Sequence, residues 1–501
     1  MYTSIRMVLV VGLLLGVIVG FHGCPPPPNG TNTPDRERLT QAEIDAGIYN
    51  TYELMRMGRD LTLHQFVVSE GYGNGRNGAT PPNFNRFLGP DSTSCNSCHG
   101  LSGIVMGWGT NVANVLVEID DLANPTVAGS NERQPPMVQG AVWLELLSKE
   151  MTQDLRAIRV QAISDAATSG MAETLPLMTK GVSFGMITAN PDGSVDTSSV
   201  EGCDPDLMIR PMHQKGMAST MRIFARGALE RHFGIQSYDL LLKMNPSRNP
   251  ARWDEDEDRV VDELNEAELT AITLFNAGLP APVETNTGES LVELGRAHMD
   301  TMGCTACHMP YLTVNDPTFR DVSSTGTLIE VNLLDPLLGL PRLQAESDGS
   351  VKVPCWTDLK RHDIGALSNE PLDQPGDNTR PNWDGGGRGE SLPYTNPPID
   401  KELMLTLKLW GVGDTTPYFH DGSMATLDDA ILAHGGEASV ARSNYQGATD
   451  GERVELLAFL AQLRVGLVGE VLPVEREAAI LRVDPANMPF NSVTEALVAI
   501  D

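Results

Sequence analysis

The sequence predicts a mainly α-helical protein with long irregular loops. Stretches with apolar residues at helical intervals recur along the chain. They cover about residues 40–62, 141–168, 217–233, 264–277, 289–303, 426–434 and 450–464. Strand signals are few, and the stretches 69–93, 180–210 and 315–400 are rich in turn-forming residues without periodicity. One cysteine motif occurs once in each half of the chain, so we expect two domains.

The repeated motif is the pentapeptide C-x-x-C-H. It consists of Cys95, Cys98 and His99 in the first copy and of Cys304, Cys307 and His308 in the second. Two thiols three residues apart on a helical turn can form thioethers with the two vinyl groups of a porphyrin. The histidine lies on the same face and can bind the iron. We therefore predict two covalently bound c-type haems, His99 and His308 as proximal ligands, and two cytochrome c-like haem domains.

Two other uses of the motif were considered. A zinc site requires four ligands brought together, and neither copy has a second Cys/His pair nearby. A pair of thioredoxin-like redox motifs would not require a histidine directly after the second cysteine. Both alternatives explain the pattern less completely than haem attachment.

The composition limits the classes of function. The chain has 501 residues, 41% of them hydrophobic, which is enough for two or three domains. A net charge of −30 argues against binding to nucleic acid or to an anionic membrane surface, and it is compatible with a basic electron donor. The acidic run at residues 254–258 is interpreted as a solvated helix start or loop in preference to a metal site.

The first residues predict export. Residues 1–23 combine Arg6 with an apolar stretch that is too short and too rich in glycine for a membrane span. Cys24 follows where a bacterial lipoprotein is cleaved and acylated, and the Pro/Asn/Thr-rich residues 24–40 form a tether. We expect a periplasmic protein that is either soluble or lipid-anchored at Cys24. This compartment suits c-type haems, which are attached outside the bacterial cytoplasm.

The rest of the chain is divided at a turn-rich break near residues 280–288. We expect an N-terminal haem domain at 41–280, a C-terminal haem domain at 285–470 and a tail at 471–501. Outside the haem motifs and the leader, the cysteines are Cys203 and Cys355. They form a disulfide only if the fold brings them together, which the sequence leaves open.

Several segments resemble the di-haem cytochrome c peroxidase superfamily. Residues 409–427, LWGVGDTTPYFHDGSMATL, resemble its TPxxHDG…TL segment. The run AHGGEA at 433–438 resembles a narrower di-haem oxidoreductase branch, whose members are labelled thiol oxidoreductases. RPMHQKG at 210–216 and RQPP at 133–136, which leads to WLE at 143–145, also resemble that branch. The resemblance spans roughly residues 80–465.

This resemblance implies ligands for the C-terminal haem. The sixth ligand of the superfamily lies 14 residues after the histidine of the HDG segment, and counting from His420 reaches His434. A pair of His308 and His434 would give a low-spin iron of low potential. The alternatives are that His434 only caps its helix and that Met424 is the ligand. His420 is expected to hydrogen-bond a propionate or the domain interface.

The resemblance further implies a calcium ion between the two domains. Thr415 and Pro417 fall where the superfamily offers backbone carbonyls to it. The partner in the N-terminal domain is not identifiable from the sequence.

In related proteins the iron of the N-terminal haem is open opposite its proximal histidine, or opens on reduction, and binds peroxide or oxygen. Peroxide cleavage needs a group that accepts and then returns a proton, and we select Glu145 for this role. The alternative is that Glu145 is an ordinary, partly exposed carboxylate on a helix. Trp143 is the first candidate for carrying electrons between the haems and Trp108 the second, although a buried tryptophan is often only a core residue. His213 is a candidate distal or capping histidine. His64 and His232 are expected to be structural.

Three functions are compatible with these features. The first is a peroxidase-like oxidoreductase that reduces hydrogen peroxide at the His99 haem with electrons from the His308 haem. Its electron donor would be a small protein or a quinol-linked system. The second is a non-catalytic electron carrier with both haems six-coordinate. The third is an oxygenase acting on an organic or polymeric substrate, as some di-haem relatives are.

Overall fold

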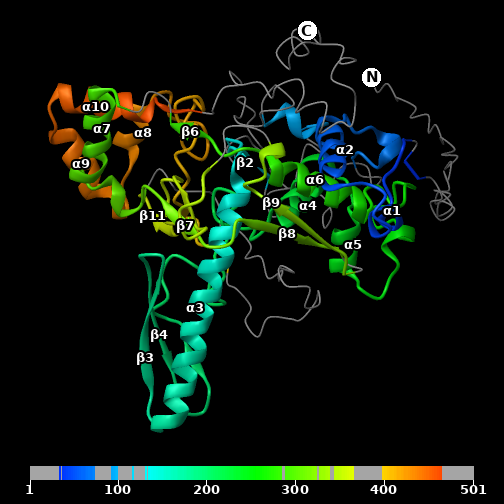
Figure 1. Cartoon of the computed structure of the whole chain (residues 1–501), viewed down its shortest axis with the longest axis horizontal. Coiled ribbons are helices and arrows are strands. Elements are labelled where there is room, and N and C mark those ends of the chain that lie inside the picture. The colour runs from blue at the N-terminus through cyan, green and yellow to red at the C-terminus, as the bar shows by residue number, and fades with distance from the viewer. Residues whose placement is uncertain are drawn as a thin grey trace, which may run out of the picture.

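The computed structural model describes residues 33–34, 36–73, 92–99, 116–117, 130–131, 134–284, 288–323, 326–338, 343–365 and 398–464. Two groups of helices lie on opposite sides of the upper end of one long helix, which extends away from both (Figure 1). The export signal, Cys24, Trp108 and the tail fall outside the described residues.

The N-terminal helices form around a close crossing of α2 and α6. A Cβ atom on Gly58 of α2 would lie 1.9 Å from the carbonyl oxygen of Ala271 of α6, so only glycine allows this approach. Both helices begin with a capping box, made by Asn50 with Glu53 and by Asn265 with Glu268. The elements of this half are α1 (Gln41–Asp45), α2 (Thr51–Leu63), α4 (Met221–Ala228), the π-helical turn η5 (Leu229–Phe233), α5 (Tyr238–Met244) and α6 (Glu266–Gly278).

Two of the C-terminal helices also cross closely at a glycine. A Cβ on Gly295 of α7 would lie 2.0 Å from the carbonyl oxygen of Glu455 of α10. The crossing buries Val292, Met299 and Phe459 in a separate core cluster. The elements are α7 (Ser290–Thr301), α8 (Leu427–Ala433), α9 (Ser439–Gly447) and α10 (Asp450–Leu460). Each half therefore has a glycine-mediated helix crossing, and each also contains one C-x-x-C-H motif, which forms a 3-10 turn: η2 (Cys95–Ser97) or η7 (Cys304–Ala306).

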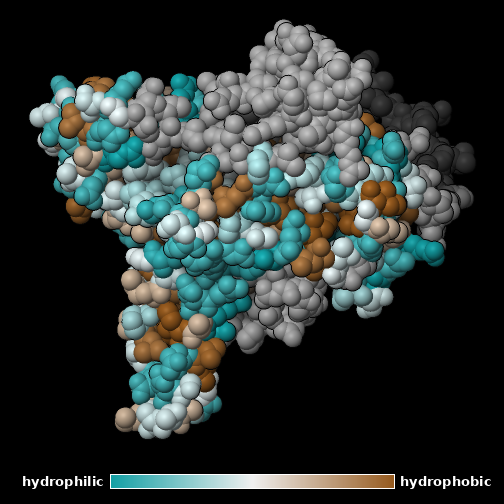
Figure 2. Space-filling model, in the orientation of Figure 1, coloured by the Kyte–Doolittle hydropathy of each residue, from teal (hydrophilic) through white to brown (hydrophobic). Residues whose placement is uncertain are grey.

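The long helix is α3 (Ala141–Ser169), which supports a projecting three-stranded sheet (Figure 1). The strands β3 (Glu173–Thr179), β4 (Val182–Ala189) and β5 (Val195–Asp196) are antiparallel in the order β3-β4-β5. Fully buried Leu177, Phe184 and Ile187 belong to the main core cluster together with residues of α3. Figure 2 shows apolar colour on this arm, which includes the exposed Met171 and Met178. We predicted residues 180–210 as irregular, and this was wrong for β4, because Gly185 and the serines obscure its alternation.

The segment predicted as one long loop at 315–400 contains hairpins where it is described. Some of its strands pair antiparallel with one another, and others pair antiparallel with strands that lie just before or just after the segment in the chain. Residues 312–359 contribute Leu312, Phe319 and Val353 to the same core cluster as α3. The pairs are β7 (Leu312–Val314) with β10 (Val351–Val353), β8 (Thr318–Val322) with β9 (Leu328–Asn332), and β11 (Arg361–Asp363) with β12 (Leu403–Leu405).

The remaining short elements complete the described chain. They are β1 (Leu116–Val117) with β2 (Ser130–Asn131), β6 (Val283–Glu284) with β13 (Leu463–Arg464), and the 3-10 turns η1 (Val68–Glu70), η6 (Pro250–Arg252), η8 (Pro336–Leu338) and η10 (Gly436–Ala438). The fold is thus rich in helices, as predicted, with more strands than expected. None of the described helices has both the length and the apolar composition needed to cross a membrane.

Candidate haem sites

The second C-x-x-C-H motif opens on a cavity of about 520 Å³. This volume lies within the range of about 300 to 1,000 Å³ that is usual for cofactor and ligand sites. Cys304, Cys307 and His308 contribute to one wall, and His434 enters from the end of α8. Much of the remaining lining is apolar: Ile364, Leu405, Leu407, Leu409, Trp410, Val412, Leu427, Ile431, Leu456 and Leu460.

His308 and His434 face one another in this cavity. Their ring centroids are 6.5 Å apart. Metal–imidazole bonds of about 2 Å on each side, plus the distance from nitrogen to ring centre, require roughly 6 Å between centroids. The spacing therefore fits one iron held between the two rings.

Backbone contacts select the nitrogen that each ring presents. His308 Nδ1 lies 3.0 Å from the Trp356 carbonyl oxygen, and His434 Nδ1 lies 2.7 Å from that of Ala430. A carbonyl only accepts, so both Nδ1 atoms donate and both Nε2 atoms keep a lone pair for a metal. Burial lowers the pKa of His308 to about 4 and also lowers the pKa of His434. Both rings are therefore held in the neutral form that binds iron.

The other residues predicted for this haem also lie near it. His420, Thr415 and Pro417 line the cavity, whereas Met424 does not. The carbonyl oxygen of His420 accepts a hydrogen bond of 2.7 Å from Gln134 N, which ties this segment to the N-terminal half. Among the two candidate sixth ligands, only His434 has access to the cavity.

His362, a buried imidazole that was not among the predicted site residues, helps to position His434. His362 Nε2 is 2.8 Å from Asp358 Oδ2, and its Nδ1 is 2.8 Å from Glu437 Oε2. Burial lowers the pKa of His362, but hydrogen bonds with Asp358 and Cys307 outweigh it and raise the pKa to about 11. The charged ring anchors Glu437, three residues after His434. The only sequence signal was the AHGGEA run that contains this glutamate.

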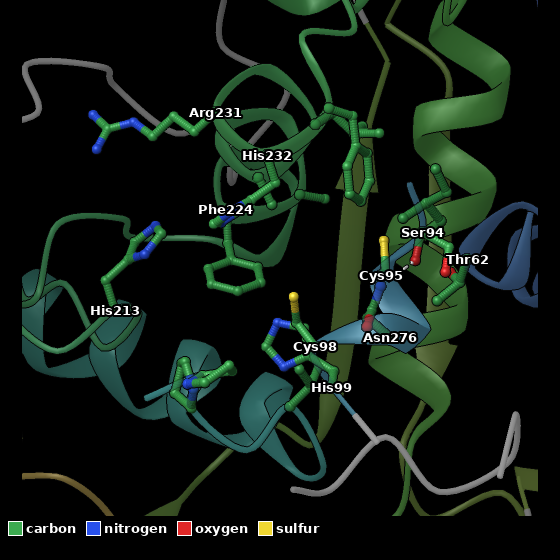
Figure 3. Close-up of a pocket in the computed structure, with 18 of the residues that line it drawn as sticks. Thr62, Ser94, Cys95, Cys98, His99, His213, Phe224, Arg231, His232 and Asn276 are labelled. Carbon is green, nitrogen blue, oxygen red and sulfur yellow. Dashed lines mark hydrogen bonds between the residues drawn. The ribbon is translucent and has the colours of Figure 1, made fainter. Parts of the chain in front are cut away.

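The first C-x-x-C-H motif lines a smaller cavity of about 120 Å³ (Figure 3). Cys95, Cys98 and His99 contribute to its wall. Burial, and next the charge of His232, lower the pKa of His99 to about 4, and the backbone of Pro136 hydrogen-bonds its ring. This donor set fits a c-type haem, although the cavity is smaller than the usual ligand site.

Phe224 occupies the space beside His99. Its ring centroid is 6.3 Å from that of His99 and 4.8 Å from that of His213 (Figure 3). His213 and His232 also line the cavity. His232, which we expected to be structural, is part of the cavity wall. His64 lies outside that wall and hydrogen-bonds Glu70 Oε2 at 2.8 Å.

Glu145 and Trp143 lie elsewhere than the sequence predicted. Both are 3% exposed, and neither lines either cavity. Trp143 packs in the main core cluster. Glu145 Oε2 accepts a hydrogen bond of 2.7 Å from Met221 N, the first residue of α4, and thus satisfies a free N–H at a helix start. The start of α3, where both residues lie, is buried in the core, and neither side chain belongs to the described lining of a cavity.

The two cavities share a wall that the sequence analysis did not identify. Gln134, Pro135, Pro136 and Gln214 line both of them. Gln214 Nε2 donates to the Gln134 carbonyl oxygen at 2.9 Å, which closes the wall. Lys408 lines the C-terminal cavity, and its charge also lowers the pKa of His99. Arg133 of the predicted RQPP run lies outside the described residues.

Cys203 and Cys355 are both free thiols, so the disulfide left open by the sequence does not form in this structure. Burial raises the pKa of each to about 12. Neither thiol lines a haem cavity.

Comparison with known proteins supports a di-haem redox role. Residues 399–463 match the family described as "Di-haem oxidoreductase, putative peroxidase", which confirms the resemblance seen in the sequence and includes His420 and His434. The match supports haem as the cofactor. None of the curated proteins compared matches the chain.

Two solved structures are similar over most of the chain. Hydrazine synthase of Kuenenia stuttgartiensis, pressurised with 20 bar xenon, has 14% identity and a TM-score of 0.31, with 92% of this chain and 99% of that chain covered. A MauG-like protein associated with microbial copper homeostasis has 16% identity and a TM-score of 0.31, with 87% and 92% covered. Scores this low carry no conclusion about the fold.

Proposed function

We propose, starting from the match to the di-haem oxidoreductase family, that this chain is a di-haem c-type cytochrome that reduces hydrogen peroxide. The N-terminal haem would be the reaction site, and the C-terminal haem would relay electrons to it. The observation that carries the proposal is the difference between the cavities. His308 is faced by a second imidazole at 6.5 Å, whereas the ring paired with His99 among the described residues is that of Phe224, at 6.3 Å, and a phenyl ring cannot bind iron.

The C-terminal residues suit electron transfer. When bound, each haem supplies an iron that changes its redox state. His308 and His434 would hold one haem iron between them, and two imidazole ligands would exclude a substrate from that iron and favour a low potential. The cluster of His362, Asp358 and Glu437 keeps the loop after His434 in position.

The N-terminal residues suit proton transfer to a small oxidant. We assign to His213 the proton-transfer role that was predicted for Glu145. An imidazole exchanges a proton near neutral pH, and His213 lines the cavity beside Phe224. Its backbone has φ of +65°, an uncommon conformation for a residue other than glycine and one that clusters at functional sites.

Electrons would cross the shared wall of Gln134, Pro135, Pro136 and Gln214. Trp143 lines neither cavity, whereas these four residues line both, so the proposal does not route electrons through Trp143. We further propose that each half is a cytochrome c-like domain, supported by the repeated glycine crossing next to each motif. A calcium ion at Thr415 and Pro417 remains part of the proposal, since Gln134 hydrogen-bonds the same segment.

The proposed setting is the periplasm, with Cys24 as an optional lipid anchor. The net charge of −30 favours a basic electron-donor protein, and a quinol-linked donor is the second option. The proposed compartment and the proposed electron donor are both inferred from the sequence alone.

The test is low-temperature electron paramagnetic resonance on the purified holoprotein, as isolated and after half-reduction. We expect one low-spin ferric haem and one that is high-spin in at least one state, with peroxide turnover in the half-reduced protein. Two low-spin signals in both states, without turnover, would instead identify an electron carrier. A stable oxygen adduct without peroxide turnover would identify an oxygenase.

A further inference from the structure

An acidic loop between η6 and α6 brings three carboxylates together. Asp254, Asp256 and Asp258 each offer an oxygen, and these oxygens lie within 4.8 Å of one another. Asp256 is only 1% exposed. The sequence favoured a solvated segment here, which is wrong for Asp256, because the loop packs its central carboxylate inward.

The second observation concerns the oxygens that the loop does not use. Each aspartate accepts a backbone N–H with one oxygen: Asp254 from Arg259, Asp256 from Asp258, and Asp258 from Val260. The remaining oxygens, Asp254 Oδ1 and Asp256 Oδ2, are buried, and no donor among the other described residues reaches them. A buried acceptor without a partner is costly, so these two atoms are satisfied either by a proton that Asp254 and Asp256 share or by a bound cation.

A fourth carboxyl group interacts with this cluster. Glu263 is 1% exposed, and burial together with the charges of Asp256 and Asp258 raises its pKa. Burial and the neighbouring Asp258 raise the pKa of Asp256 to about 8. Crowded buried carboxylates destabilise one another unless they take up protons or a cation balances their charge.

The spacing matches the start of a calcium-binding loop. Aspartates at positions 1, 3 and 5 supply ligands in the EF-hand, position 6 makes a sharp turn, and position 7 supplies a backbone carbonyl. Counted from Asp254, position 6 is Arg259 with φ of +79°, and position 7 is Val260. The loop differs at position 12, which is Asn265, so the nearby Glu263 is the available substitute for the usual glutamate.

We infer that Asp254, Asp256 and Asp258 bind one calcium ion, with Glu263 balancing its charge. Hard oxygen ligands and the absence of His or Cys from this set favour calcium over a transition metal. The site is separate from the one predicted at Thr415 and Pro417.

The ion would connect two elements of the N-terminal cavity. Gln236, just after η5, accepts a hydrogen bond from Glu255 N and donates its own N–H to Glu263 Oε2 at 2.7 Å. η5 contributes His232 to the cavity, and α6, which follows the loop, contributes Asn276. Calcium would therefore hold η5 and α6 in their relative position.

The experiment is a calcium titration of the chelator-treated, full-length holoprotein by isothermal calorimetry. Asp256→Asn keeps the side-chain shape and removes the charge, and it should weaken this site at least tenfold. Glu257→Gln removes an exposed carboxylate from the same loop and should keep the affinity within about twofold. Equal affinities in the wild type and Asp256→Asn would overturn the proposal.

Two measurements keep the result unambiguous. If the wild type binds two calcium ions, Asp256→Asn should lose one and leave any ion at Thr415 and Pro417 in place. If Asp256→Asn does not fold, as judged by its haem spectrum, Asp258→Asn replaces it. A wild-type protein that binds no calcium, or that binds magnesium equally well, contradicts the inference.

Discussion

At the scale of single residues, His434 combines three properties that a haem ligand needs. It faces the proximal histidine, its Nδ1 is held by a carbonyl, and burial keeps it neutral. We expect His434→Ala to convert the C-terminal haem from low-spin to high-spin, because His434 is the imidazole that the described residues place opposite His308. The measurement is electron paramagnetic resonance of the ferric protein.

The control for this variant is His298→Ala. His298 bonds Glu455 on the helix pair α7 and α10 and does not line the cavity. Its spectrum should match the wild type. A low-spin signal retained in His434→Ala would mean that another residue is the ligand.

His213 is the residue on which the proposed proton transfer depends. His213→Gln should lower the rate of peroxide turnover about 100-fold, the usual contribution of a general acid–base group. The resonance spectrum should stay unchanged, since His213 is not assigned as a ligand. His64→Gln, which changes a histidine outside the cavity, should keep full activity; a similar loss in both variants would count against the assignment.

Glu145 makes stability depend on pH in a predictable direction. Burial raises its folded-state pKa from 4.5 to about 8, so the folded protein holds a proton that the unfolded chain has lost. The free energy of unfolding should therefore fall as pH rises from 4.5 to 8, by up to about 1.4 kcal/mol per pH unit from this group.

Denaturant titrations at several pH values test this linkage. Glu145→Gln should show a shallower fall with pH than the wild type, because the titrating group is gone. Glu293→Gln, at a half-exposed carboxylate on α7, should follow the wild type. Parallel curves for the wild type and Glu145→Gln would show that Glu145 is not the source.

At the scale of elements, the two glycine crossings determine how closely the helices approach. Gly295→Ala would force α7 and α10 apart, because the new Cβ would meet the Glu455 carbonyl at 2.0 Å. We expect a loss of about 1 to 3 kcal/mol in the free energy of unfolding, as for other overpacked sites.

The matched control is Gly227→Ala in α4. A Cβ there meets no atom within 4 Å, so the variant should be about 0.5 to 1 kcal/mol more stable, as expected for alanine in a helix. Thermal unfolding of both variants distinguishes the effect of packing from that of helix propensity. Equal stabilities would contradict the role of the crossing.

Elements with regular spacing were predictable, and those with interrupted spacing were not. The helices α3, α6 and α7 were confirmed close to their predicted bounds because their apolar positions are contiguous on one face. The predicted helix at 40–62 is two helices, since the chain turns at Gly47 with φ of +65°. Strand β4 was missed because its alternation is short and interrupted.

At the scale of the whole molecule, the two cavities share one wall. In addition, Lys408, which lines the C-terminal cavity, acts through its charge on His99 in the N-terminal cavity. A positive charge nearby stabilises the reduced, less positive iron. Lys408→Met should therefore lower the reduction potential of the N-terminal haem by on the order of 60 mV. This shift corresponds to a tenfold change in the equilibrium constant of a one-electron reduction. Potentiometric titration of the holoprotein measures this shift.

Lys352→Met serves as the control, because Lys352 is exposed on β10 and pairs with Glu346. Its potentials should be those of the wild type. An unchanged potential in Lys408→Met would mean that its charge is screened from the His99 site.

The sequence by itself determined the features that depend on covalent spacing. The two C-x-x-C-H motifs, and the interval from His420 to His434, are fixed along the chain, so the predicted attachment residues and sixth ligand could be named without a structure. The tertiary structure alone decided which side chains meet from distant segments. It joined Gln134 to His420, put His362 beside Glu437, and buried Asp256. It also brought the Glu145 carboxylate to the N–H of Met221 at the start of α4. The reason is physical: burial and cavity lining depend on packing between segments far apart in the chain, and local spacing does not specify that packing.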